Sequence, residues 1–384
     1  MLRILIGLLL AAAALTVSAT PAEQARARVL ETFAQLERNR IPVDPEVING
    51  PWRAPPINRN AYTYTFDEIR DNWDYLMRGL LIAYPSPEYI ERLANRYPNL
   101  MHEMYYGDAD WEQHSLNVLE VWQAFFRGDY RKARDLGIHY GGYAEVPGSF
   151  AQILHAIYLT ESYEEKQMHL QDVVDRIAHF GRAFPFLPGD NDFAADYVMV
   201  RMGLAYAVGR LAEDETVARV LAAGYAPIVI NLGAEIIGVA PDHPVVLALN
   251  AALDANLIRR VGRAASGRLT FGVEPINAVE QFERAIELVD DMAVLRYEFA
   301  NSLLYMESSA QTDRAIQHLE AAVEFEPAFS MEALDILYAG KRLEEVRAWQ
   351  GTGMSYRAFD RARRNYMREH GINLYSVYHE PFTP

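Results

Sequence analysis

A stretch near the C-terminal end decides the fold, and over residues 276–330 it reads INAVEQFERAIELVDDMAVLRYEFANSLLYMESSAQTDRAIQHLEAAVEFEPAFS. Two helical copies within it carry a small–large–small set of residues with identical spacing, 37 residues apart: Ala278, Phe282 and Ala285, then Ala315, Leu319 and Ala322. Small alanines let two helices approach closely, and the large apolar residue fills the groove between repeats. Pro327 then ends the repeat, because proline cannot continue a helix. The stretch therefore predicts stacked helical hairpins.

Looser versions of the same pattern extend upstream, so residues 66–350 are predicted to be one array of paired helices. Before them, residues 20–65 hold an opening helix and a proline-rich segment that forms either a linker or a loop packed on the surface. After them, residues 351–384 hold a basic helix and an aromatic tail. The predicted fold class is all-α, a helical-hairpin solenoid wound as a right-handed superhelix with an irregular N-terminal arm and a C-terminal capping helix.

Several segments resemble exported bacterial tetratricopeptide-repeat proteins, and the resemblance covers roughly residues 118–340. The segments that carry it are Gly128-Asp129-Tyr130 with Ala133, Ala205 to Arg210, Arg268 to Gly272, Glu298 to Leu303, and Pro327 with Met331 to Asp335. The last two repeats also look like the tetratricopeptide partner subunit of certain tripartite periplasmic transporters. That subunit is often lipid-anchored, whereas this chain has no cysteine to carry a lipid. The resemblance implies an architecture and a binding role, and no catalytic residues.

The first 19 residues are predicted to be a secretory signal peptide. Arg3 supplies a positive start, Ile4 to Leu15 form an apolar run, and Val17-Ser18-Ala19 places small residues before a cleavage site. The mature chain then begins at Thr20. A retained membrane anchor is the alternative, although the run is shorter than the roughly twenty residues that span a bilayer. Export without any cysteine favours the bacterial periplasm.

The mature chain is strongly acidic. Removing residues 1–19 takes one of the 36 Lys and Arg and none of the 52 Asp and Glu, so the net charge becomes 35 − 52 = −17. Such a surface repels phosphate backbones, and nucleic acid is therefore not an expected partner.

Two clusters of titratable residues are weighed as sites and rejected. The first runs from His102 to His114 and matches no compact metal-binding spacing. The second places His139, Tyr140 and Tyr143 around a glycine pair, an arrangement that suits acid–base chemistry but more often lines a helical array. No nucleophile elbow or phosphate-binding loop is present. We therefore expect no enzyme activity, no metal site and no cofactor.

The helix from Tyr356 to His370 carries a basic stripe at three- and four-residue spacing, formed by Arg357, Arg361, Arg364 and Arg368. The stripe either docks an acidic partner or an anionic membrane, or pairs with the protein's own acidic surface. The tail from Leu374 to Phe382 either lies in a groove or is disordered.

Helical arrays present a concave face to peptides or partner proteins. The residues predicted to line this groove are Asn256, Arg260 and Arg263 on one helix and Arg296, Asn301 and Tyr305 on another. The leading hypothesis is a periplasmic scaffold or adaptor that binds a protein or peptide in envelope assembly or solute uptake. The alternative is a small-molecule-binding accessory subunit of a transport system, with an enclosed aromatic pocket in place of an open groove. An enzyme is the third and least favoured hypothesis.

Overall fold

The computed structural model describes residues 31, 34–38, 40–98, 110–183, 191–213, 215–262, 266, 273–306 and 311–384. The regular secondary structure among these residues is helical, apart from one isolated bridge between Ser162 and Ile372, so the predicted all-α class is confirmed. The helices are α3 (Pro45–Asn49), η2 (Arg59–Tyr62), α4 (Phe66–Asp71), α5 (Trp73–Leu76), α6 (Pro87–Arg96), α7 (Trp111–Arg127), α8 (Tyr130–Tyr140), η4 (Gly142–Ala144), α9 (Glu145–Leu154), η5 (His155–Leu159), α10 (Tyr163–Ala183), η6 (Asn191–Phe193), α11 (Ala194–Glu213), α12 (Val217–Ala222), α13 (Tyr225–Val239), α14 (Pro244–Val261), α16 (Pro275–Leu288), α17 (Ala293–Tyr305), α18 (Thr312–Val323), α19 (Ser330–Gln350) and α20 (Tyr356–His370).

The predicted signal peptide and most of the predicted opening helix lie outside the described residues. Among the helices that the structure does describe, none combines the length and the apolar character that crossing a bilayer requires.

Local sequence signals begin and end the helices. Thr65 and Glu68 form a reciprocal capping box at the start of α4. Ser86 caps α6, where its hydroxyl accepts a hydrogen bond from the backbone N–H of Tyr89. Helix α7 ends at Gly128, whose φ of +86° lies in the left-handed region that glycine occupies without a steric penalty.

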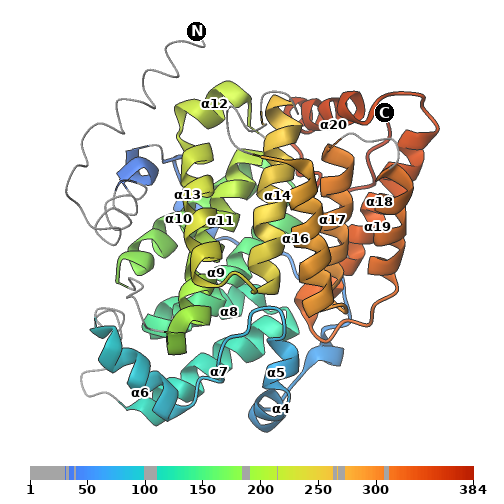
Figure 1. Cartoon of the computed structure of the whole chain (residues 1–384). Helices are drawn as coiled ribbons and strands as arrows, with labels where there is room; N and C mark the ends of the chain where they lie inside the picture. Colours follow the sequence, from blue (N-terminus) through green and yellow to red (C-terminus); the bar gives the residue numbers. More distant parts are fainter. Residues whose placement is uncertain are drawn as a thin grey trace.

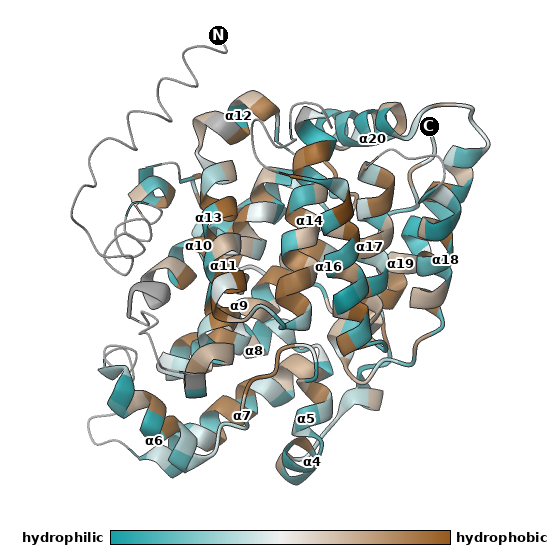
Figure 2. Ribbon diagram, in the orientation of Figure 1, coloured by the Kyte–Doolittle hydropathy of each residue, from teal (hydrophilic) through white to brown (hydrophobic). Residues whose placement is uncertain are grey.

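The repeat stripes seen in the sequence are the buried faces of two outer helices. Helix α16 buries Ala278, Phe282 and Ala285, and α18 buries the equivalent residues of the second copy. The ring of Phe282 stacks on Phe299 of α17 at a centroid distance of 4.9 Å. Helix α17, in contrast, is buried on nearly every side. Figure 2 shows that much of α18, and of the C-terminal helix α20, is hydrophilic on the visible side.

The chain alternates between inner and outer helices, and the inner helices close into a ring. Helices α9, α11, α14, α17 and α19 each contact the next, and α7 contacts both α19 and α9. Each outer helix (α8, α10, α13, α16 or α18) packs against two consecutive helices of that ring. The closing contact is specific, because the Ser330 hydroxyl bonds with the Tyr130 hydroxyl and donates to the Phe125 carbonyl. The inner faces therefore surround a filled interior.

The N-terminal segment covers one end of this ring. Helices α4 and α5 lie at the bottom of Figure 1, and α6 lies at the lower left, on the other side of α7. Their segment contacts the beginnings of four inner helices, through Tyr89 to Asp196, Leu80 to His243, Arg78 to both Asp291 and Glu332, and Tyr64 to Ala328.

Helix α20 and the tail that follows it cover the opposite end, at the top of Figure 1. Lys341 of α19 donates to the carbonyls of Leu374 and Ser376 at 2.9 and 2.8 Å. The side-chain amide of Asn373 donates to three carbonyls and one hydroxyl between residues 156 and 160. The tail therefore lies in a groove of the array, the first of its two predicted alternatives.

Candidate functional site

Two of the predicted groove residues are interior residues. Asn301 is 4% exposed and Tyr305 is 7% exposed. The Asn301 side chain accepts a hydrogen bond from Arg342 at 3.1 Å, and the guanidinium of Arg259 lies 4.2 Å from the centre of the Tyr305 ring. The prediction that these two residues line an open groove is wrong, because α17 is an inner helix of a closed ring.

The other predicted groove residues are partly exposed, except Arg263, which lies outside the described residues. Arg260 donates to the carbonyls of Ala212 and Glu215, so its guanidinium binds the chain that leaves α11. Asn256 accepts a hydrogen bond from Arg259 at 3.1 Å. Arg296 makes a long hydrogen bond of 3.4 Å to the carbonyl of Asp290. None of these contacts brings the set together around a cavity in the described structure.

The basic stripe of α20 is divided between solvent and internal pairing. Arg357 and Arg361 are exposed. Arg364 is paired with Asp360 at 3.1 Å, and Arg368 donates to the Asn365 side chain. The pairing of Arg364 agrees with the alternative in which the stripe binds the protein's own carboxylates.

A network of buried charges fills the interior of the ring. Arg259 binds both Asp360 and Glu213, at 2.6 and 3.1 Å. Arg210 bridges Glu213 and Glu298 at 2.7 and 2.5 Å. Each guanidinium thus faces two carboxylates from different parts of the chain. Removing a charge from water is costly unless it is paired and hydrogen-bonded, and these groups satisfy that condition.

The same interior holds a tyrosine–aspartate group. The Tyr158 hydroxyl lies 2.6 Å from the Tyr297 hydroxyl and 2.8 Å from a carboxylate oxygen of Asp335. Burial raises the pKa of Asp335 to about 8, although the bonds from the two tyrosines favour its charged form. A carboxyl that is protonated at neutral pH resembles a general acid. However, all three side chains are at most 3% exposed, so the group stabilises the interior and presents no surface to a substrate.

A cleft of about 560 Å³ lies between the proline-rich arm and the start of α8. Trp52, Arg53, Ala54 and Arg59 line it from the arm, and Gly128 to Lys132, Asp135 and Leu136 line it from the array. The arm is held there by an ion pair between Arg59 and Asp129 and by a hydrogen bond from Arg131 to the carbonyl of Gly50. This arrangement confirms the packed-loop alternative for the proline-rich segment.

Trp52 separates this cleft from two buried histidines. Its ring stacks on His155 at 4.1 Å with an interplanar angle of 10°, and meets the His169 ring edge-on at 5.1 Å. His155 begins the π-helical turn η5, and His169 lies on α10. Burial lowers the pKa of both rings, that of His169 to about 4, so both are neutral at physiological pH. Single π-helical turns occur frequently at functional sites.

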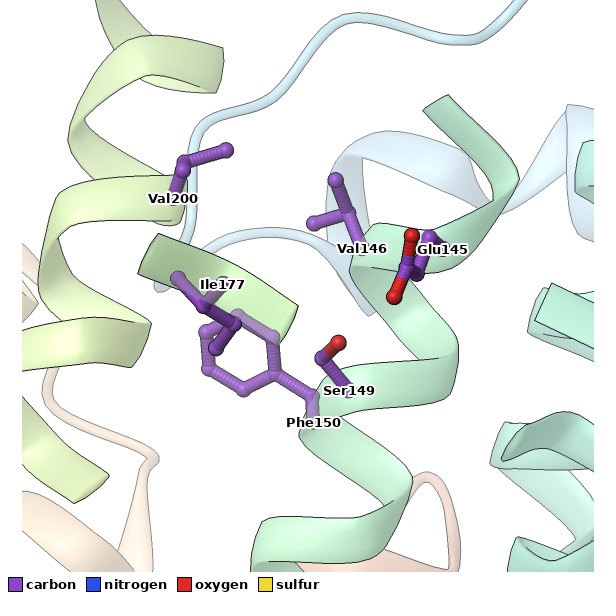
Figure 3. Close-up of a pocket in the computed structure, with 6 residues that line it drawn as sticks. All are labelled: Glu145, Val146, Ser149, Phe150, Ile177 and Val200. Atoms are coloured by element: carbon purple, nitrogen blue, oxygen red, sulfur yellow. The ribbon is translucent and has the colours of Figure 1, made fainter. Parts of the chain in front are cut away.

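A second cavity is too small to bind a ligand. It lies among Glu145, Val146, Ser149, Phe150, Ile177 and Val200, whose side chains surround it in Figure 3. Its volume of about 10 Å³ is at the lower limit for a single water molecule.

The two clusters rejected from the sequence differ in how much of each the structure describes. Most of the segment from His102 to His114 lies outside the described residues, and His114 itself is fully buried in α7. His139 is exposed on α8, whereas Tyr143 is buried and donates to Asp196 on another helix. Tyr140 donates to Glu120 at 2.7 Å. The hypothesis that His139, Tyr140 and Tyr143 form an acid–base site is therefore not supported.

The sequence reasoning missed the region around Trp52. The only local signal was the four-residue spacing of Glu165 and His169, which places both side chains on one face of a helix. Nothing local pointed to Trp52 or His155, because they come from separate segments of the chain. Comparison of the chain with known protein families, with characterised proteins and with solved structures finds no match.

Proposed function

We propose that the chain is an exported adaptor built of tetratricopeptide-like helix pairs, which binds a segment of a partner protein and catalyses no reaction. The sequence resemblance, the export signal and the repeat stripes of α16 and α18 support this proposal. The right-handed superhelical relation between the pairs is part of the proposal. The proposed location is the bacterial periplasm, because an exported chain without cysteine, and therefore without disulfides, fits that compartment.

The observation that carries the binding role is the cleft between the proline-rich arm and α8. It combines an aromatic wall, Trp52, with the exposed side chains of Arg53 and Lys132, which form surface ion pairs with Glu161 and Glu120. Aromatic and arginine side chains dominate binding energy at protein interfaces, since they bury large areas or form several hydrogen bonds. Both walls carry exposed residues, Arg53 and Ala54 on the arm and Lys132 and Asp135 on α8, which an extended segment of polypeptide could contact.

A small-molecule ligand is the second candidate, and the size of the cleft favours it. A volume of about 560 Å³ lies within the roughly 300–1,000 Å³ typical of small-molecule sites. This alternative matches an accessory subunit of a periplasmic transport system. The two candidates predict different results when a charge on the wall of the cleft is reversed. The adaptor would lose a bound protein, whereas the accessory subunit would lose a bound metabolite.

Three matched charge reversals test which surface binds the partner. Lys132→Glu changes the cleft, Arg361→Glu changes the α20 stripe, and Arg296→Glu changes the predicted groove. The mature chain and each variant would be used to capture proteins from a periplasmic extract, with bound proteins identified by mass spectrometry. We expect one stoichiometric protein to be lost with Lys132→Glu and retained with the other two.

The contrary outcomes are specific. Loss of the captured protein with Arg361→Glu or Arg296→Glu alone would transfer the binding role to that surface. Capture of no protein, together with a metabolite that raises the melting temperature of the wild type but not of Lys132→Glu, would replace the adaptor by the transport accessory.

A further inference from the structure

Three potential metal ligands converge behind Trp52. The ligand atoms of His155, Glu165 and His169 all lie within 4.8 Å of one another. Glu165 and His169 are one helical turn apart on α10, so they project from the same face. His155 reaches the same point from the π-helical turn η5, where the wider turn shifts its side chain relative to a regular helix.

The histidine nitrogens at this point are buried without hydrogen-bond partners. His155 is 1% exposed, and neither of its ring nitrogens has a partner. His169 is fully buried, and its Nε2 atom also lacks one. A buried polar atom that is left unsatisfied costs about 1–3 kcal/mol, and most such atoms in proteins are paired. Three unsatisfied nitrogens on two touching rings therefore indicate a missing ligand.

The remaining nitrogen of His169 has only a weak contact. Its Nδ1 atom lies 3.3 Å from the side-chain amide nitrogen of Gln152, which donates a shorter bond of 2.9 Å to Asp172. The contact assigns the ring proton to Nε2 in the neutral imidazole. An ion at Nε2 requires the other tautomer, in which the ring proton lies on Nδ1, so Nδ1 no longer accepts the weak hydrogen bond from Gln152.

The ligand types of the cluster suit a divalent transition-metal cation. The cluster contains one carboxylate, that of Glu165, and the carboxylate of Asp172 lies nearby, where it accepts a hydrogen bond from Gln152. Cationic side chains also lie nearby: Arg53 of the arm, Arg131 and Arg134 of α8, and Arg176 of α10. Two nitrogens and one oxygen are ligands typical of zinc and neighbouring transition metals, whereas calcium and magnesium prefer oxygen alone.

We propose that His155, Glu165 and His169 bind a divalent transition-metal ion of the zinc type beneath Trp52. Ligand atoms around a tetrahedral zinc ion are about 3.3 Å apart, so the three side chains need to close by about 1.5 Å at most. The ion fixes the end of α9 to α10 under the ring of Trp52, and so supports the wall of the neighbouring cleft. This site is independent of the adaptor role.

The first test titrates the metal-free mature chain with Zn²⁺ by calorimetry. We expect one ion to bind per chain, and Glu165→Gln to weaken binding at least about tenfold. Glu164→Gln is the matched control, because Glu164 is exposed and adjacent on the same helix. Zn²⁺ is also expected to raise the melting temperature of the wild type and of Glu164→Gln, but not of Glu165→Gln. Circular dichroism in the presence of a chelator checks that all three chains are folded.

A second measurement detects the ion directly in the wild type. Cu²⁺ bound beneath Trp52 is expected to quench tryptophan fluorescence, because the indole ring stacks directly on His155. Trp52→Phe removes this quenching and leaves the Zn²⁺ stoichiometry unchanged. Failure of the wild type to bind Zn²⁺, or equal weakening by Glu164→Gln and Glu165→Gln, would overturn the proposal.

Discussion

The interior of the ring and the cluster beneath Trp52 are both buried and polar, but they differ in whether their polar groups have hydrogen-bond or ion-pair partners. In the interior, Glu345 is fully buried and faces Arg342 and Arg363, and it also accepts a hydrogen bond from the backbone N–H of Phe382. Beneath Trp52, the nitrogens of His155 lie against an aromatic ring and meet no protein donor or acceptor. A satisfied network of this kind stabilises one arrangement of helices, whereas the unpaired histidine nitrogens are the basis of the proposed metal site.

The two clusters also differ in which parts of the chain they hold together. The charged interior joins residues that are far apart in sequence, such as Arg259 and Asp360, and thereby ties the inner helices to α20. The histidine cluster joins the arm to α9, η5 and α10, which follow one another in the chain. Loss of an interior charge should therefore affect the whole molecule, whereas loss of a histidine should affect one side of it.

Glu345→Gln should have the largest effect. The substitution leaves two buried guanidinium groups without their shared carboxylate, which costs about 3–5 kcal/mol when a buried pair is broken. Chemical denaturation measures the change in the free energy of unfolding. Glu320→Gln is the control, because its pair with Arg347 is about half exposed, and it should cost less than about 1 kcal/mol. Equal losses for the two variants would mean that the interior network does not hold the ring together.

Asp335→Asn should change how stability depends on pH. Burial raises the pKa of Asp335 from 3.8 to about 8, so between these values the folded chain holds a proton that the unfolded chain releases. The free energy of unfolding therefore falls as pH rises through this window, on the order of 3 kcal/mol between about pH 5 and about pH 8. Asparagine keeps an acceptor for Tyr158 and stays neutral, so the variant should lack this fall.

Denaturation curves at several pH values measure the effect of Asp335→Asn. Asp196→Asn provides an internal comparison, because burial raises the pKa of Asp196 only to about 6. Its effect should be complete by about pH 6. Parallel profiles for the wild type and Asp335→Asn would show that this carboxyl is ionised inside the folded protein.

His169→Gln should have the smallest of the three effects, with the opposite sign. Burial lowers the pKa of His169 from 6.5 to about 4, so the unfolded chain binds a proton that the folded chain lacks within this window. In metal-free protein, His169 should lower stability by on the order of 2 kcal/mol as pH falls from about 6.5 to about 4, and the variant should lose this contribution while the other buried histidines, such as His114 and His155, keep theirs. His139→Gln on the exposed side of α8 is the control and should keep it. An unchanged acid profile in His169→Gln would contradict the assignment of a neutral buried ring.

The sequence was most informative where the physical signal is local. The alanine stripes of α16 and α18 were readable because the packing of one helix on its neighbour depends on residues three and four apart. The same reasoning failed for Asn301 and Tyr305. Both are polar or amphipathic residues on a helix with a separate apolar face, and such residues normally face water. Here the helix is enclosed, and Arg342 and Arg259 satisfy them.

The amino-acid sequence by itself determined an all-helical chain of paired helices, because helix periodicity, caps and small-residue stripes act over a few residues. Only the tertiary structure decided that the series closes through Ser330 and Phe125, and that closure turned one predicted surface into an interior. It also decided that Trp52, His155 and His169 meet. Contacts of this kind join segments more than a hundred residues apart, so no local pattern records them.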